Sequence, residues 1–135
     1  MRSAKLTAGA VAAAALGLAG AALADTMHPV LGAKLSGMGE HGVVNLHSYV
    51  SKQQLCWTFE LPAAGETGAS LRDSAGMVVA HLGRTYKAKG CATVPAKTLG
   101  LVEARPASYR IWVDTKSHMG ELRGTLFAGM AHMGG

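Results

Sequence analysis

Apolar and polar residues alternate over several short stretches of the chain, and the clearest of these is Gln54–Leu61. Every second residue in it is large and apolar, namely Leu55, Trp57, Phe59 and Leu61. A period of two predicts a strand with one buried face. Because Pro62 lacks the N–H that a sheet ladder needs, the strand is expected to end before it.

A second alternating run, Val43–Val50, precedes this strand, and the polar connector Ser51-Lys52-Gln53 predicts a hairpin between the two. Similar patterns predict strands at Leu31–Ser36, Met77–Leu82, Cys91–Val94, Tyr109–Thr115 and Glu121–Phe127. Only Thr98–Ala104 suggests a helix. This spacing favours an all-β sandwich or barrel of about seven to eight short strands.

The first residues, Met1–Ala24, have the three parts of a secretory signal peptide. Two basic residues precede an apolar stretch from Leu6 to Leu18, and Ala22-Leu23-Ala24 offers the small residues that signal peptidase accepts. The apolar stretch is shorter than the ~20 residues of a spanning helix. Cleavage after Ala24 predicts a periplasmic or secreted mature chain, residues 25–135, with no membrane span.

Composition indicates one small exported domain with a Gly-, Met- and His-rich C-terminal tail. Apolar residues make up 49% of the chain and charged residues 16%, which excludes a disordered polymer. Without Arg2 and Lys5 of the signal segment, 11 basic residues stand against 8 acidic ones, a net charge of +3. Because this excess is scattered rather than gathered in a dense run, no nucleic-acid partner is expected.

Cys56 and Cys91 are the two cysteines of the sequence, so a single intramolecular pairing exists. In the oxidising compartment that the signal peptide predicts, they are expected to form a disulfide. Their separation of 35 residues excludes CxxC redox chemistry. The chain-entropy model gives such a bridge a stabilisation of roughly 3.5–4 kcal/mol.

The C-terminal stretch Tyr109–Leu126, YRIWVDTKSHMGELRGTL, resembles the closing hairpin of the CHRD domain, the module named from chordin. Three other segments are similar to CHRD motifs in the same order: Ala33-Lys34-Leu35-Ser36-Gly37, Leu55-Cys56 and Gly90-Cys91. The resemblance covers roughly Val30–Ala128. It implies an immunoglobulin-like or Greek-key β fold and an extracytoplasmic setting, and it implies no enzymatic activity.

Two departures limit what the resemblance implies about ligands. CHRD domains usually carry a His-x-His segment where this chain has Ala69-Ser70-Leu71-Arg72-Asp73. They also often have a histidine in the closing hairpin where this chain has Asp114. The resemblance therefore implies the fold and the disulfide, and it does not imply a metal site.

Methionine and histidine recur close together near the chain ends and the expected turns. Four such groups are Met27-His28, Met38 with His41, His118-Met119, and Met130 with His132-Met133. Thioether and imidazole together suit Cu(I), and imidazole also binds Cu(II), so these nine residues are candidate copper ligands. Met77, by contrast, is expected in the core, and His47 and His81 are expected as surface or hydrogen-bonded strand residues.

Antiparallel pairing of the first and last strands would gather the candidate ligands into two clusters. The first cluster consists of Met27, His28, Met130, His132 and Met133. The second consists of Met38, His41, His118 and Met119. The opposite interpretation is that the methionines fill gaps in the core and that the tail is only solvated.

Alternation also places Glu121 and Arg123 on one face of the closing hairpin, opposite Leu122 and Leu126. Arg123 is predicted to pair there with a carboxylate such as Asp114 on the neighbouring strand. Such a contact is worth ~0.2–1 kcal/mol where it is exposed.

Motifs of the common hydrolases and nucleotide-binding enzymes are missing: GxSxG, HExxH, the P-loop and the dinucleotide fingerprint. A copper–zinc dismutase needs closely paired strand histidines, and the nearest two here, His41 and His47, are six positions apart. The sequence therefore predicts a non-catalytic exported binding module that handles copper through His and Met. The alternative is a metal-free module that binds a protein or a cell surface.

Overall fold

The computed structural model describes residues 28–62, 65–116 and 118–133. The predicted signal segment, residues 1–24, lies outside these ranges. The described strands are β1 (Val30–Gly37), β2 (Glu40–Tyr49), β3 (Gln54–Glu60), β4 (Glu66–Asp73), β5 (Val78–His81), β6 (Lys89–Thr93), β7 (Tyr109–Thr115), β8 (Leu122–Thr125) and β9 (Phe127–Ala128). The helices are α2 (Ala96–Ala104) and the 3-10 turns η1 (Val50–Lys52) and η2 (Pro106–Ser108). Within the described ranges, none of these helices has the length and apolar character to cross a membrane.

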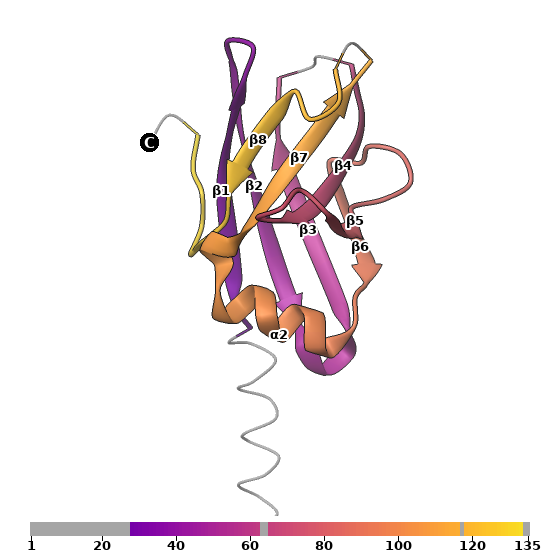
Figure 1. The fold of residues 1–135 in the computed structure, drawn as a ribbon, viewed down its shortest axis with the longest axis vertical. Coiled ribbons are helices and arrows are strands. Elements are labelled where there is room, and N and C mark those ends of the chain that lie inside the picture. Colours follow the sequence, from indigo (N-terminus) through magenta and orange to yellow (C-terminus); the bar gives the residue numbers. More distant parts are fainter. Residues whose placement is uncertain (1–27, 63–64, 117, 134–135) are drawn as a thin grey trace, which may run out of the picture.

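All the strands belong to one antiparallel sheet that curves into a nearly closed barrel (Figure 1). The strand order is β5-β4-β7-β8-β1-β2-β3-β6, and β9 pairs with β1 beyond β8. The first strand thus lies between the second and the last, as the predicted clusters require. The expectation of an all-β fold of short strands is confirmed, in the form of a barrel.

The hairpin between β1 and β2 is tight because its two central residues adopt positive φ angles. Met38 has φ 52° and Gly39 has φ 79°, the backbone pattern of a type I′ turn, which matches the twist of the flanking strands. The register runs from Val30 opposite His47 to Gly37 opposite Glu40. This turn therefore projects Met38 from one end of the barrel.

The core fills the inside of the barrel with the alternate residues that the sequence pattern selects. On β3 the buried residues are Leu55, Trp57 and Phe59, as the period of two predicts. Helix α2 crosses one end of the barrel (Figure 1) and buries Leu99 and Val102 against the same core. Ser48 at the end of β2 donates a hydrogen bond of 2.5 Å to the Glu103 carboxylate, which ties the helix to the sheet.

The sequence pattern did not reveal strand β4, and it wrongly placed Met77, just before β5, in the core. Strand β4, which pairs with both β5 and β7, was not predicted, because its small residues obscure the alternation of Ala69 and Leu71 toward the core. Met77 is 66% exposed rather than buried, since it lies in the turn before β5 and not within the strand. The expected helix at Thr98–Ala104 is confirmed as part of α2.

Candidate functional site

Three of the four residues of the second predicted cluster meet at one end of the barrel. The antiparallel pairing of Ser36 with Arg123 sets the turn after β1 beside the loop before β8. Met38, His118 and Met119 line a common pocket there, with a volume of about 340 Å³. The two thioethers are largely in solvent, Met38 at 67% and Met119 at 72% exposure. The fourth member, His41, does not line this pocket.

The loop that carries His118 is fixed by its own hydrogen bonds. The His118 backbone N–H donates to Thr115 Oγ1, and Thr115 Oγ1 donates a 2.7 Å hydrogen bond to Glu121. The same Glu121 oxygen lies 3.7 Å from His118 Nδ1. At this distance the carboxylate and the ring make an electrostatic contact and not a hydrogen bond. The His118 backbone is therefore fixed by its loop, and its imidazole lies beside the Glu121 carboxylate.

The C-terminal strap, residues 129–133, runs along the outside of β1 and β2. Asn45 fixes it with two hydrogen bonds: its Nδ2 donates to the Ala131 carbonyl at 3.0 Å, and its Oδ1 accepts from the Ala131 N–H at 2.7 Å. Both residues are buried. A Cβ at Gly32 would lie 2.7 Å from the Ala131 nitrogen, so the glycine leaves the space in which the strap lies.

This strap carries His132 and Met133 to a different partner from the one predicted. Together with His41 they line a pocket of about 400 Å³, whose other lining residues include Lys34. The first predicted cluster therefore does not form as expected, because the tail continues along β1 and β2 toward His41 instead of stopping beside His28. Met27 lies outside the described residues. Met130 is half exposed on the strap and lines neither of these two pockets.

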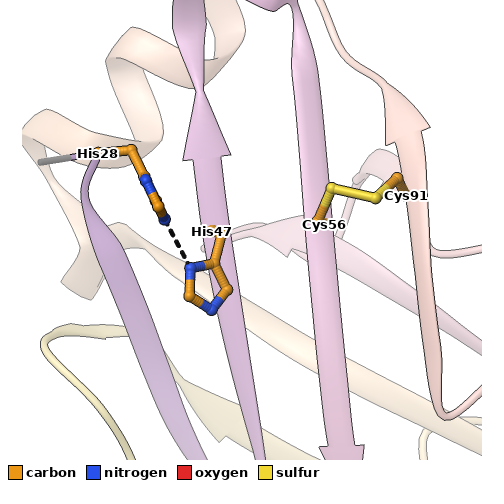
Figure 2. The surroundings of a disulfide bond; sticks show 4 residues. All are labelled: His28, His47, Cys56 and Cys91. Carbon is orange, nitrogen blue, oxygen red and sulfur yellow. Dashed lines mark hydrogen bonds between the residues drawn. A yellow bond between two sulfur atoms is a disulfide. The ribbon is translucent and has the colours of Figure 1, made fainter. Parts of the chain in front are cut away.

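His28 is instead paired with His47 on the outer face of β2 (Figure 2). Its Nε2 lies 2.7 Å from His47 Nδ1, and its ring packs against Tyr49 with centroids 4.3 Å apart. Burial, together with the adjacent His28, lowers the pKa of His47 below its usual 6.5. The expectation that His47 is a hydrogen-bonded strand residue is confirmed.

The predicted disulfide forms across neighbouring strands next to this histidine pair (Figure 2). Cys56 of β3 is opposite Cys91 of β6, with Cα atoms 4.0 Å apart, and it is also opposite His47 of β2. Since β6 is one edge of the sheet, the bridge ties that edge strand to the interior of the sheet.

Arg123 makes a different contact from the predicted ion pair. Its guanidinium lies 3.8 Å from the ring centroid of Trp112, its partner across the β7–β8 ladder, and its Nε donates to the Gly120 carbonyl. Asp114 accepts a hydrogen bond from the Gly120 N–H instead. Among the described residues no ion pair within 4.0 Å joins Arg123 and Asp114, and the prediction was wrong because the indole face is the nearer partner.

The donor chemistry of the described residues limits the kinds of metal site. In the part of the chain that the structure describes, no three His, Cys, Asp or Glu side chains gather into a metal-binding group. The two methionine-containing pockets instead combine histidine with thioether donors. Asn45 was missed because its partner, Ala131, is 86 positions away and no local pattern reveals their closeness. Glu121 is three positions from His118, but the sequence alone does not show how the turn between them folds.

No family model, no characterised protein and no solved structure matches this chain. The resemblance to CHRD domains thus stays a prediction, which rests on the closing hairpin Tyr109–Leu126 and on the three shorter motifs that precede it.

Proposed function

We propose that this chain is an exported, non-catalytic, CHRD-like binding module that holds copper through methionine and histidine. The observation that carries the proposal is the meeting of Met38, His118 and Met119 in one pocket from two turns far apart in the sequence. Two thioethers and one imidazole form a soft donor set that suits Cu(I).

The exposure of the two methionines supports this role over a structural one. Methionine in a protein usually fills gaps in the core, where its flexible side chain is buried. Met38 and Met119 are 67% and 72% exposed, so they contribute little to the packing of the barrel. Their placement beside the His118 imidazole is consistent with a role as ligands.

His41, His132 and Met133 offer a second, weaker candidate for the same metal. Two imidazoles and a thioether also suit copper, but the Lys34 side chain lines the same pocket and its positive charge opposes a bound cation. A cation, Arg123, lines the Met38 pocket as well, but the Glu121 carboxylate also lines that pocket, whereas the pocket of His41 has no carboxylate among its lining residues. For this reason the Met38 pocket carries the proposal.

Export is supported by the signal-like N-terminal sequence and by the disulfide. A bridge such as Cys56–Cys91 persists in oxidising compartments and is rare in the cytosol. Copper ligands built from thioether rather than thiolate also fit such a compartment, because methionine is not consumed by disulfide formation.

The test is competition of the mature chain against a chromogenic Cu(I) chelator under anaerobic conditions. The variant Met38→Leu/Met119→Leu keeps the side-chain size and removes both sulfurs. Its Cu(I) affinity is expected to fall at least tenfold, or its bound copper to fall by one ion per chain. The control is Met77→Leu, which removes a methionine of similar exposure, 66%, that does not line the pocket, and this variant should bind copper as the wild type does.

Equal copper binding by the double variant and the wild type would contradict this site. Absence of copper binding by the wild type would favour the alternative, a metal-free module in which the exposed methionines contact a protein or a cell surface.

A further inference from the structure

A polar hollow lies on the outer face of β4, between the segment that follows β5 and strand β7. Its volume is about 240 Å³, and it shares no lining residue with either methionine-containing pocket. Gly68 and Ser70 of β4 lie along its floor. A Cβ on Gly68 would have a single neighbour, Asp114 Oδ2 at 3.9 Å, so the floor is open at this point.

Arg72 lies at one side of the hollow and is held in a fixed orientation. Its Nε donates to Ser70 Oγ at 2.9 Å, its Nη1 donates to the Gly76 carbonyl at 3.0 Å, and its guanidinium lies 4.1 Å from the Trp112 ring centroid. Arginine has five N–H donors, so these two hydrogen bonds leave three for a further partner. A guanidinium fixed in this way loses little entropy when it binds an anion.

The other charged side chains around the hollow leave it with an excess of positive charge. Arg84, exposed after β5, and His81 of β5 line it together with Arg72, and Asp114 is the carboxylate among its lining residues. Among the described residues, no ion pair within 4.0 Å joins Arg72 or Arg84 to a carboxylate, so neither arginine is neutralised at that distance.

Asp114 also has an oxygen available on the side of the hollow. Its Oδ1 accepts the Gly120 N–H, whereas its Oδ2 is the atom nearest to the space above Gly68. A site with donors on several sides and one carboxylate acceptor suits a tetrahedral oxyanion that carries a proton. Inorganic phosphate retains at least one P–OH near neutral pH and can donate it to a carboxylate, whereas sulfate has no such proton.

We propose that this hollow is a binding site for inorganic phosphate, in which Arg72 and Arg84 bind the anionic oxygens and Asp114 accepts the phosphate proton. Arginine matches phosphate oxygens through charge-assisted, often paired hydrogen bonds. The Asp114 carboxylate repels a fully deprotonated anion, so it selects phosphate over sulfate. A phosphate monoester has lost its last proton above a pKa of about 6 and is rejected for the same reason.

Isothermal titration calorimetry of the mature chain with phosphate and with sulfate tests the site. The wild type is compared with three single variants, Arg84→Gln, Arg105→Gln and Asp114→Asn. The wild type is expected to bind phosphate at least tenfold more tightly than sulfate. Arg84→Gln should weaken phosphate binding at least tenfold. Arg105→Gln removes the same charge from an exposed residue outside the hollow and should change the affinity less than twofold.

Asp114→Asn keeps the oxygen that accepts from Gly120 and replaces the other by a donor, so the preference for phosphate over sulfate should disappear. Methyl phosphate at about pH 8, where it is a dianion, should bind far more weakly than inorganic phosphate. Equal binding of phosphate and sulfate by the wild type, an unchanged affinity in Arg84→Gln, or an equal loss in Arg84→Gln and Arg105→Gln would overturn the proposal. A matching urea midpoint for Arg84→Gln and the wild type shows that the lost binding is not lost folding.

Discussion

Replacement of Asn45 by Ala is expected to release the C-terminal strap from the barrel. Asn45 is a buried polar residue on the outer face of β2, and its amide makes both of its hydrogen bonds to the backbone of Ala131. Alanine makes neither bond. The strap would then keep a single backbone anchor, the Gly129 N–H donating to the Val30 carbonyl at 2.8 Å.

The expected loss of unfolding free energy is about 1–3 kcal/mol, since each of the two neutral hydrogen bonds contributes about 0.5–1.5 kcal/mol net. If the strap stayed in place, the N–H and carbonyl of Ala131 would be buried without partners, at a further cost of about 1–3 kcal/mol each. Detachment avoids that cost, because the freed backbone bonds to water. It also regains about 1–2 kcal/mol of conformational entropy per residue. The strap is therefore expected to detach while the barrel stays folded.

Two measurements check this expectation, the urea midpoint of the barrel and amide hydrogen exchange along the strap. In Asn45→Ala, exchange of the Ala131 amide should accelerate at least tenfold, which corresponds to about 1.4 kcal/mol. The core amides of β2 and β3 should stay protected, and their exchange should accelerate only by the factor that corresponds to the loss of global stability. Unchanged protection of Ala131, together with an unchanged urea midpoint, would refute the role of Asn45.

Two further variants separate the hydrogen bonds from the general effect of mutating this face. Asn45→Asp keeps an acceptor for the Ala131 N–H and sets a carboxylate oxygen against the Ala131 carbonyl, so it should destabilise the strap at least as much as alanine does. Thr58→Ala changes the residue opposite Asn45 on β3 and should leave the strap protected. Equal loss of protection in Thr58→Ala would mean that the face, rather than the amide, holds the strap.

Three other changes test separate parts of the structure. Cys56→Ala/Cys91→Ala should lower the unfolding free energy by roughly 3.5–4 kcal/mol in urea titrations, and a loss below about 1 kcal/mol would contradict the chain-entropy argument. Burial and the adjacent His28 lower the pKa of His47 in the folded chain. As the pH falls below 6.5, His47 is therefore protonated in the unfolded chain before it is protonated in the folded chain. The unfolding free energy should fall over this range, down to the pKa of the folded state. His47→Gln should flatten this part of the profile of urea midpoint against pH, and an identical slope would contradict it. Gly32→Val sets a Cβ 2.7 Å from a strap nitrogen and should accelerate strap amide exchange, while unchanged exchange would show that the strap can shift.

Local alternation was sufficient to predict most of the barrel. On β3, and on the inner face of β2, the residues expected inside are buried, because successive side chains of a strand point to opposite faces. The disulfide was equally determined, since two cysteines allow one pairing. The meeting of Met38 with His118 and Met119 followed from the order of the strands, once the first and last strands were assumed to pair.

Tertiary structure alone decided what covers the outer face. The period of two places Asn45 and His47 on the face of β2 opposite Val44 and Leu46, and it leaves open whether solvent or another segment covers that face. Asn45 is buried because the strap crosses it, and the same strap sets His132 beside His41 while His47 takes His28 as its partner. A strand pattern fixes the direction of each side chain over a few residues, whereas the segment that lies against that side chain depends on the path of a distant part of the chain.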